Sequence, residues 1–432
     1  MTVSTTLPGR HVVLRFPREV EASSSSAPTD RDETYQLLEL PLEILKRMEG
    51  GKGEAFPLTI KGRPGDEAVL CTPDSTFLLR TVTISNSILV CRNPSSQPLS
   101  DSSLPTSPTY SQDPSAPLGA PTLEIRDMCH SILEPLPCAP NLERIRKLLR
   151  PSSWRGLGED DAGSGSRGSR KRKRGVGDEG KRWTRQQLGS VIQASEAELE
   201  KGLRERNVVE VDDRMLLLPP TKLAPLLTLI LTLLTIHSSS ATSPSPKSPS
   251  PSASASSSSI TRALEQDHDL PTPLGLAVLE LFGTIGDGMW EADVRGMVRE
   301  VGKGLLEGLK GPVGRDSFLG RWKGEVGQSW EGFVRLELLE GNYLLDPAPP
   351  SQRLSDPFIL THFPAHTLPL QPPMRFSDLF LTRPRWRPED MEPFLAGLTR
   401  EGDKKERDKL VSKFVRVVKE KEGVWWYPRR TS

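Results

Sequence analysis

The sequence predicts a multidomain α+β protein, with one N-terminal β-barrel-like module followed by three helical modules that end in short β segments. Three observations lead to this class. The chain has 432 residues, which allows about three domains at roughly 150 residues each. Its 40 prolines and 35 glycines make up about 17% of the chain, above the average usage of about 12%, which indicates globular modules separated by linkers. Short strand-like runs fill the first part, whereas helical periodicity dominates the rest.

Segments poor in large apolar residues mark the module boundaries. Residues 93–121 and 238–259 are rich in Ser and Pro, and residues 151–180 are rich in Gly, Ser and charge. Such segments bury too little apolar surface to offset their ordering entropy, so we expect disordered linkers there. The remaining parts are a β-barrel-like module, a bridging segment and three helical modules, at residues 1–92, 122–150, 181–237, 260–346 and 353–432.

The first module is predicted to be a small barrel or half-barrel. A helix is expected to open at Pro41, because proline is tolerated at the first helical position. Short runs rich in Val, Ile, Leu, Thr and Phe surround it, and we expect strands at 11–16, 35–40, 56–61, 67–72, 76–84 and 87–91. About 80 residues build only a thin core, so exposed strand edges are expected to pair with another chain.

The second module has the local order of a winged helix. A helix is predicted at 184–192, and Ser195-x-x-Glu198 is a capping box that opens a second helix. Two short apolar runs around Asp212-Asp213-Arg214 then predict a hairpin. The apolar run 223–236 has 14 residues, fewer than the roughly 20 of a spanning helix, and is predicted to be a core helix. We expect neither a membrane span nor a secretory signal.

The last two modules repeat the pattern less clearly. In the third, helices are expected at 273–282, 290–301 and 318–326, followed by an extended stretch at 333–345. In the fourth, helices are expected at 376–381, from Pro388 and over 409–419, and a strand is expected at 424–427.

Enzymatic and metal chemistry find no support in the sequence. The four cysteines, at 71, 91, 129 and 138, show no Cys-x-x-Cys spacing and are too few for a disulfide scaffold. No phosphate-binding Gly-x-x-x-x-Gly-Lys-Ser/Thr loop is present. We therefore expect a non-catalytic protein without cofactor or metal.

Any contact with nucleic acid must come from a local basic patch, because 57 Lys and Arg against 56 Asp and Glu leave a net charge of +1. Residues 400–430 hold eleven basic and six acidic residues. A helix over 409–419 would place Lys409, Lys413 and Arg416 on one face, with Lys404 and Lys405 just before it. These five residues are the predicted DNA-binding residues, through phosphate contacts. The alternative is an ordinary solvated helix face.

Three further features each admit two interpretations. The cluster Arg170-Lys171-Arg172-Lys173-Arg174 is predicted to be a nuclear localisation signal, with a loose DNA tether as the alternative. The Ser-Pro sites in 242–251 could accept phosphate or serve as a passive spacer. Trp425, Trp426 and Tyr427 could stack on single-stranded bases, but a core role is the more frequent one for such a strand.

Three segments resemble the DCC-type sister chromatid cohesion family, a subunit of the alternative (chromosome transmission fidelity) replication factor C clamp loader. The most specific spans residues 58–90, with Ile60-Lys61-Gly62, the run from Asp66 to Thr72, and Ser85-Asn86. The second segment is C-terminal and contains Arg375-Phe376, Leu379-Phe380, Arg383-Pro384-Arg385-Trp386 and Asp390-Met391-Glu392-Pro393. The third and weakest match comprises Leu188 and Ile192-Gln193-Ala194-Ser195-Glu196.

The resemblance implies a scaffold for replication. The N-terminal module would complete a β-barrel with a very small companion subunit and the C-terminal tail of the loader's large subunit. Three winged helices would follow. They would contact single- or double-stranded DNA and would help attach the loader to DNA polymerase epsilon. The sliding clamp would be reached indirectly, ATP would be bound by other subunits, and the protein would work in the nucleus. A free-standing winged-helix DNA-binding regulator and an adaptor without DNA contact remain the alternatives.

Overall fold

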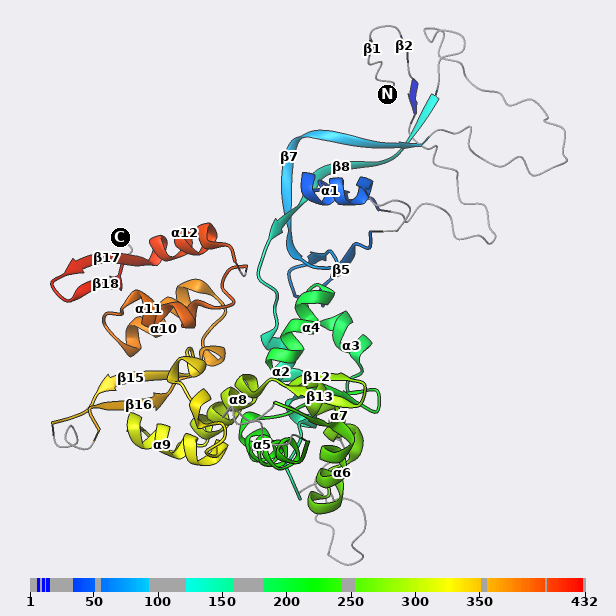
Figure 1. Ribbon diagram of the computed structural model, residues 1–432. Coiled ribbons are helices and arrows are strands. Elements are labelled where there is room, and N and C mark those ends of the chain that lie inside the picture. The colour runs from blue at the N-terminus through cyan, green and yellow to red at the C-terminus, as the bar shows by residue number, and fades with distance from the viewer. Residues whose placement is uncertain are drawn as a thin grey trace, which may run out of the picture. The chain divides into compact units, whose positions relative to one another are not determined.

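The computed structural model describes residues 6–7, 10–11, 13–15, 34–50, 56–92, 122–158, 182–241, 253–350, 356–400 and 402–429 (Figure 1). Helices and strands both occur along the chain, so the predicted α+β class is confirmed. The chain divides into two compact units. Unit 1 comprises Met1–Phe56 and Phe77–Leu136, and unit 2 comprises Pro57–Thr76 and Pro137–Ser432. The predicted linker 93–121 and most of 151–180 lie outside the described residues.

Unit 1 is built on two long neighbouring strands, β7 (Thr76–Arg92) and β8 (Thr122–Pro137), which curl into a half-barrel sheet (Figure 1). Two short strands pair with β8 in parallel, β3 (Val13–Arg15) and β4 (Leu37–Leu38). The other elements among the described residues of this unit are a pair of two-residue strands and one helix, namely β1 (Thr6–Leu7), β2 (Arg10–His11) and α1 (Leu42–Gly50). The helix begins at Leu42, one residue after the predicted first position, Pro41.

Two expectations for this part were wrong. The strands predicted at 76–84 and 87–91 are one continuous strand, because the polar residues between them point into solvent and do not need a turn. The segment 122–150, predicted to be a bridge, opens with the sixteen-residue strand β8. Apolar and charged residues alternate at its start, from Leu123 to Arg126, which suits a strand with one covered face.

The first part of unit 2 is a compact set of helices with two hairpins. It contains β5 (Thr59–Lys61), β6 (Val69–Cys71), α2 (Glu143–Leu149), the 3₁₀ turn Arg150–Ser152, α3 (Arg185–Val191), α4 (Glu196–Glu205), β9 (Val208–Val211) and β10 (Arg214–Leu217). The predicted capping box is confirmed, since Ser195 and Glu198 satisfy each other's backbone N–H groups. Asp212 and Asp213, with φ of 51° and 59°, form the tight turn of the predicted hairpin.

The middle of unit 2 surrounds one apolar helix. That helix, α5 (Pro220–Ala241), buries Leu223, Leu227 and Ile230, as expected of a core helix. Within the described residues it is the one helix long and apolar enough to cross a membrane, over Pro220–Ser238. Around it lie β11 (Ser254–Ser256), α6 (Ser257–His268), α7 (Thr272–Leu281), β12 (Gly283–Gly286), β13 (Met289–Ala292), α8 (Val294–Glu307) and α9 (Arg315–Val326). Helix α5 and strand β11 therefore extend into the segment 238–259, which was predicted to be a linker.

Two element predictions in this region were wrong. Trp290 lies in strand β13, and the helix predicted from it begins only at Val294, where Asp293 caps the first turn. The stretch 333–345 is not extended throughout, because 3₁₀ turns at Glu331–Phe333 and Leu336–Leu339 precede β15 (Tyr343–Pro347).

The C-terminal part begins with a three-stranded sheet of order β14-β16-β15, in which β14 is Val313–Gly314 and β16 is Phe358–His362. After it come a 3₁₀ turn (Ala365–Thr367), α10 (Pro372–Thr382), α11 (Pro388–Met391), a second 3₁₀ turn (Glu392–Leu395), α12 (Lys404–Phe414), β17 (Val415–Glu420) and β18 (Gly423–Pro428). The helix predicted over 409–419 was wrong beyond Phe414. From Val415 onward, β-branched residues pair with β18 as a hairpin instead.

Candidate nucleic-acid interface and a charged groove

Helix α12 carries a lysine stripe opposite its buried face. Val411 is buried, and Phe414 stacks on Phe376 with ring centroids 5.0 Å apart, so this side faces the core. Lys405, Lys409 and Lys413 are spaced by four residues and are exposed. At 100° per residue they fall within one narrow arc on the solvent side. This stripe can contact several phosphates of one backbone.

The five predicted DNA-binding residues are all exposed, but they do not share one face. Arg416 lies on strand β17, and its guanidinium is 5.7 Å from the centroid of the Tyr427 ring. Lys404 begins the helix and lines a groove. The lysine stripe therefore contains Lys405 in place of Arg416, and the i, i+4 spacing in the sequence was the signal for it.

Two tryptophans of the last hairpin lie in different environments. Trp426 is 9% exposed and exchanges two backbone hydrogen bonds with the buried Trp386, at 2.8 and 3.0 Å. The indole of Trp425 is covered instead by two cations, the guanidiniums of Arg385 and Arg387, at 4.1 and 5.3 Å from the ring centroid. The structure thus places Trp426 in the core and leaves Trp425 half-buried beneath arginines.

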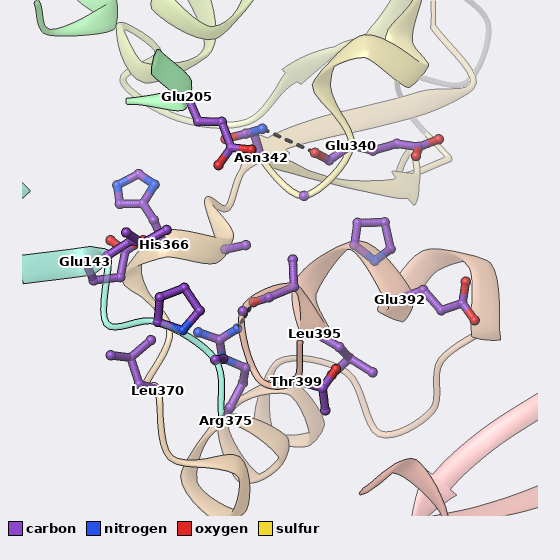
Figure 2. A pocket seen from close by; sticks show the side chains of 18 of the residues that line it. Glu143, Glu205, Glu340, Asn342, His366, Leu370, Arg375, Glu392, Leu395 and Thr399 are labelled. Atoms are coloured by element: carbon purple, nitrogen blue, oxygen red, sulfur yellow. Dashed lines mark hydrogen bonds between the residues drawn. The ribbon is translucent and has the colours of Figure 1, made fainter. Parts of the chain in front are cut away.

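A groove of about 790 Å³ opens in unit 2, where α2, α4 and α8 meet the C-terminal part (Figure 2). Arg375 forms part of its wall. Its guanidinium donates to the carbonyls of Leu368, Pro369, Phe394 and Ala396, at 2.7–3.3 Å. Burial lowers the pKa of Arg375, and these carbonyls are the acceptors that let it stay inside. Arg375 is therefore an anchor for the loops around it.

A charged cluster lies at one end of the groove, where Figure 2 shows Glu143 beside His366. Glu143 on α2 pairs with Arg206 at 2.6 Å. Arg146, one turn further along α2, donates from Nη1 to His366 Nε2 at 3.3 Å. Burial and the nearby charge of Arg146 lower the pKa of His366 to about 4, so the imidazole is neutral at physiological pH. The cluster therefore holds two guanidiniums and one carboxylate, and a second carboxylate, that of Glu205, lies 3.8 Å from Arg206.

Two segments that carry the sequence resemblance contact each other within unit 2. The loop between β5 and β6 supplies Asp66, whose carboxylate receives two hydrogen bonds from Arg144 on α2, both 2.8 Å long. This pairing lowers the pKa of Asp66 to about 2. Lys61 Nζ donates to the Ala194 carbonyl at 2.7 Å, and Thr76 donates to Glu198. These motif residues fix the β5–β6 hairpin onto the helices.

Neither the cysteines nor the histidines form a metal centre in the part of the chain that the structure describes, where no group of three possible ligands occurs. Cys71 is buried, and burial raises the pKa of its thiol. The predicted nuclear localisation residues, Arg170 to Arg174, and the Ser-Pro sites in 242–251 lie outside the described residues.

Comparison with known proteins decides the family. The model of the family described as "Sister chromatid cohesion protein Dcc1" matches residues 35–395. The chain belongs to the Dcc1 family. Among the curated relatives, "Sister chromatid cohesion protein DCC1" of Xenopus laevis is 26% identical over 91% of this chain and 88% of the relative. The mouse protein of the same name is 24% identical over 88% of this chain and 84% of its own length. Members of the family are thus named for a role in sister chromatid cohesion.

Proposed function

We propose that this protein is a non-catalytic nuclear subunit of an alternative replication factor C clamp loader. In this role it links the loader to DNA polymerase epsilon and to DNA, and so supports sister chromatid cohesion. Unit 1 joins the C-terminal tail of the large loader subunit and the very small companion subunit. The C-terminal part, built as winged helices, contacts DNA.

The exposure of strand β7 carries the proposal for unit 1. Five consecutive residues, 85–89, are exposed. Because successive side chains of a strand point to opposite faces, neither face of the sheet is covered there by the described residues. Ile88 and Leu89 are apolar and 37% and 36% exposed. A curled sheet with open apolar positions on both faces suits completion by strands from other chains.

Helix α1 adds a second uncovered apolar surface to unit 1. Leu42, Leu45 and Met48 are exposed, at 63%, 39% and 40%, and their spacing of three residues places them on one side of the helix. Ile44, on another side, is buried. The helix thus has apolar side chains both toward its own unit and toward solvent, which supports a partner contact here too.

The lysine stripe of α12 supports the DNA contact. Lys405, Lys409 and Lys413 make no ion pair within 4 Å among the described residues. Lysine ammoniums held on a rigid helix can bind phosphates without reading the base sequence. The predicted contact is therefore electrostatic and insensitive to sequence.

The partner experiment co-expresses the full chain with the tail of the large subunit and the small companion subunit. The wild-type chain is expected to elute with both as one complex in size-exclusion chromatography. The double variant Ile88→Asp, Leu89→Asp should lose the complex, because two desolvated charges cannot enter an apolar interface. Val417→Asp, which changes an exposed apolar residue of unit 2, is the matched control and should retain it.

Two outcomes would contradict the unit 1 assignment. A double variant that assembles normally would show that β7 is not the interface. A wild-type chain that ignores both partners while binding DNA would favour the free-standing DNA-binding regulator.

The DNA experiment measures the affinity of the full chain for a duplex and for a single strand over a range of salt concentrations. Replacing Lys405, Lys409 and Lys413 by Gln should weaken binding equally on unrelated sequences and reduce the slope of log affinity against log salt by up to about 3. Glu406→Gln with Asp408→Asn, on the same helix, should strengthen binding. An unchanged slope in the triple variant would exclude the stripe as the phosphate contact.

A further inference from the structure

The groove in unit 2 contains a cation without a counter-ion. Eight basic and five acidic residues line it. Arg375 donates to backbone carbonyls, Arg400 donates to Ser75, and Lys404 is exposed to solvent. Four other cations pair with carboxylates. Arg206 pairs with Glu143, and Arg407 lies 3.7 Å from Glu392. Arg299 and Lys303 both pair with the buried Glu300, at 3.1 and 2.7 Å. Their charges are used within the protein.

Arg146 is different. Among the described residues, no carboxylate lies within ion-pair distance of Arg146, and its side chain makes one hydrogen bond, to the neutral His366. Its Nε is buried and has no hydrogen-bond acceptor in the described part of the chain. Burial lowers the pKa of Arg146, which reflects the free energy lost by removing the charged guanidinium from water. An anion bound beside Arg146 would offset this desolvation free energy, because it would supply the missing hydrogen-bond acceptor and counter-charge.

Arg206 presents a second donor in the same cluster. Its Nη2 is bound to Glu143, but its Nε is also buried without an acceptor among the described residues. Glu143 and Glu205 both pair with Arg206, at 2.6 and 3.8 Å, so the charge of the cluster that has no carboxylate partner is that of Arg146, and His366 adds none at neutral pH. The cluster therefore suits one singly or doubly charged anion.

The rest of the groove indicates what carries that anion. A volume of about 790 Å³ is far larger than one inorganic ion. Glu205, Glu340, Glu392 and Asp403 also line it and would repel a polyanion such as DNA. Apolar side chains lie between the charges, namely Leu142, Leu338, Leu370 and Leu395. Charged and apolar groups together match a peptide that carries one acidic side chain among apolar ones.

We propose that this groove binds a peptide segment of a partner protein, whose single acidic side chain pairs with Arg146 and Arg206. The acidic group is a carboxylate or a phosphorylated serine, and both place oxygens against guanidinium donors. Apolar side chains of the peptide lie on the leucines of the wall. The site is separate from the lysine stripe of α12 and from the exposed sheet of unit 1.

The experiment uses the full chain and three short fluorescent peptides in fluorescence anisotropy. Their central residue, set between leucines, is glutamate, phosphoserine or glutamine. The proposal expects at least one anionic peptide to bind roughly tenfold or more tightly than the glutamine peptide, as a charged hydrogen bond would give. Arg146→Gln should abolish this preference, and Arg146→Lys should restore part of it.

The matched control is Lys147→Gln, the neighbouring exposed cation on α2, which should keep the preference. Whichever anionic peptide binds more tightly identifies the natural group as a carboxylate or a phosphate. The proposal would be overturned if the wild-type chain showed no preference for an anionic peptide, or if Arg146→Gln and Lys147→Gln lost that preference equally. It would also be overturned if duplex DNA displaced the peptide and Arg146→Gln bound DNA more weakly. The last result would assign the groove to nucleic acid.

Discussion

Unit 1 and unit 2 bury their apolar residues to very different degrees. The three apolar core clusters found among the described residues all belong to unit 2, where Trp290 and Trp322 are fully buried. In the described part of unit 1 the buried apolar side chains are few, and the curled sheet leaves Ile88 and Leu89 exposed. The comparison indicates that unit 2 is stabilised by its own core, whereas the described sheet of unit 1 leaves apolar positions uncovered, as the proposed completion by other chains requires.

The largest difference is expected from truncating one apolar residue in each unit. Trp322→Ala removes a fully buried indole that donates to the Val298 carbonyl at 3.0 Å, and should lower the free energy of unfolding by about 3–5 kcal/mol. Ile88→Ala should change it by about 0.5 kcal/mol or less. Urea unfolding followed by far-UV circular dichroism measures both. An equal loss from Ile88→Ala would show that unit 1 has a core of its own.

Hydrogen exchange should separate the two units next. All eight tryptophans lie in unit 2, so indole fluorescence does not report on unit 1, whereas amide exchange does. Amides of β7 at 82–91 are expected to exchange roughly a hundredfold or more faster than those in the middle of α5 and α8, because few apolar contacts oppose local opening. Mass spectrometry of the full chain measures this. Equal protection of amides in both regions would contradict the difference in local stability between the two units.

A pair of glycines tests how tightly unit 2 is packed. A Cβ at Gly302 would lie 2.5 Å from the Trp322 ring, so Gly302→Ala should cost about 1–3 kcal/mol. Gly320, also within a helix, has nothing within 4 Å of its Cβ position. Gly320→Ala should therefore stabilise the protein by about 0.5–1 kcal/mol. Opposite signs in thermal unfolding would support rigid packing around Trp322, and a neutral Gly302→Ala would show that this core can relax.

Local signals in the sequence were sufficient for some elements and insufficient for others. Ser195-x-x-Glu198 and Asp212-Asp213 predicted a helix start and a turn, since both depend on neighbouring backbone groups. The end of α12 was missed because Leu410, Phe414 and Val417 have a helical spacing, whereas Val415–Glu420 forms a strand through a tertiary contact, its pairing with β18. The groove could not be predicted at all, because Arg146 and His366 are 220 residues apart.

The smallest expected effect concerns the hairpin β5–β6, which belongs to unit 2 although it lies in sequence between the two parts of unit 1. Asp66→Asn removes the pairing with Arg144 and should lower the melting temperature slightly at neutral pH, because a partly exposed ion pair contributes little. The pKa of Asp66 is about 2 in the folded protein, below its ordinary value of 3.8. The stabilisation is therefore present above pH 3.8 and is lost as the pH falls toward 2. The gap in melting temperature between wild type and Asp66→Asn should close over this range. A gap that persists at the lowest pH would mean that the carboxylate charge does not hold this hairpin in unit 2.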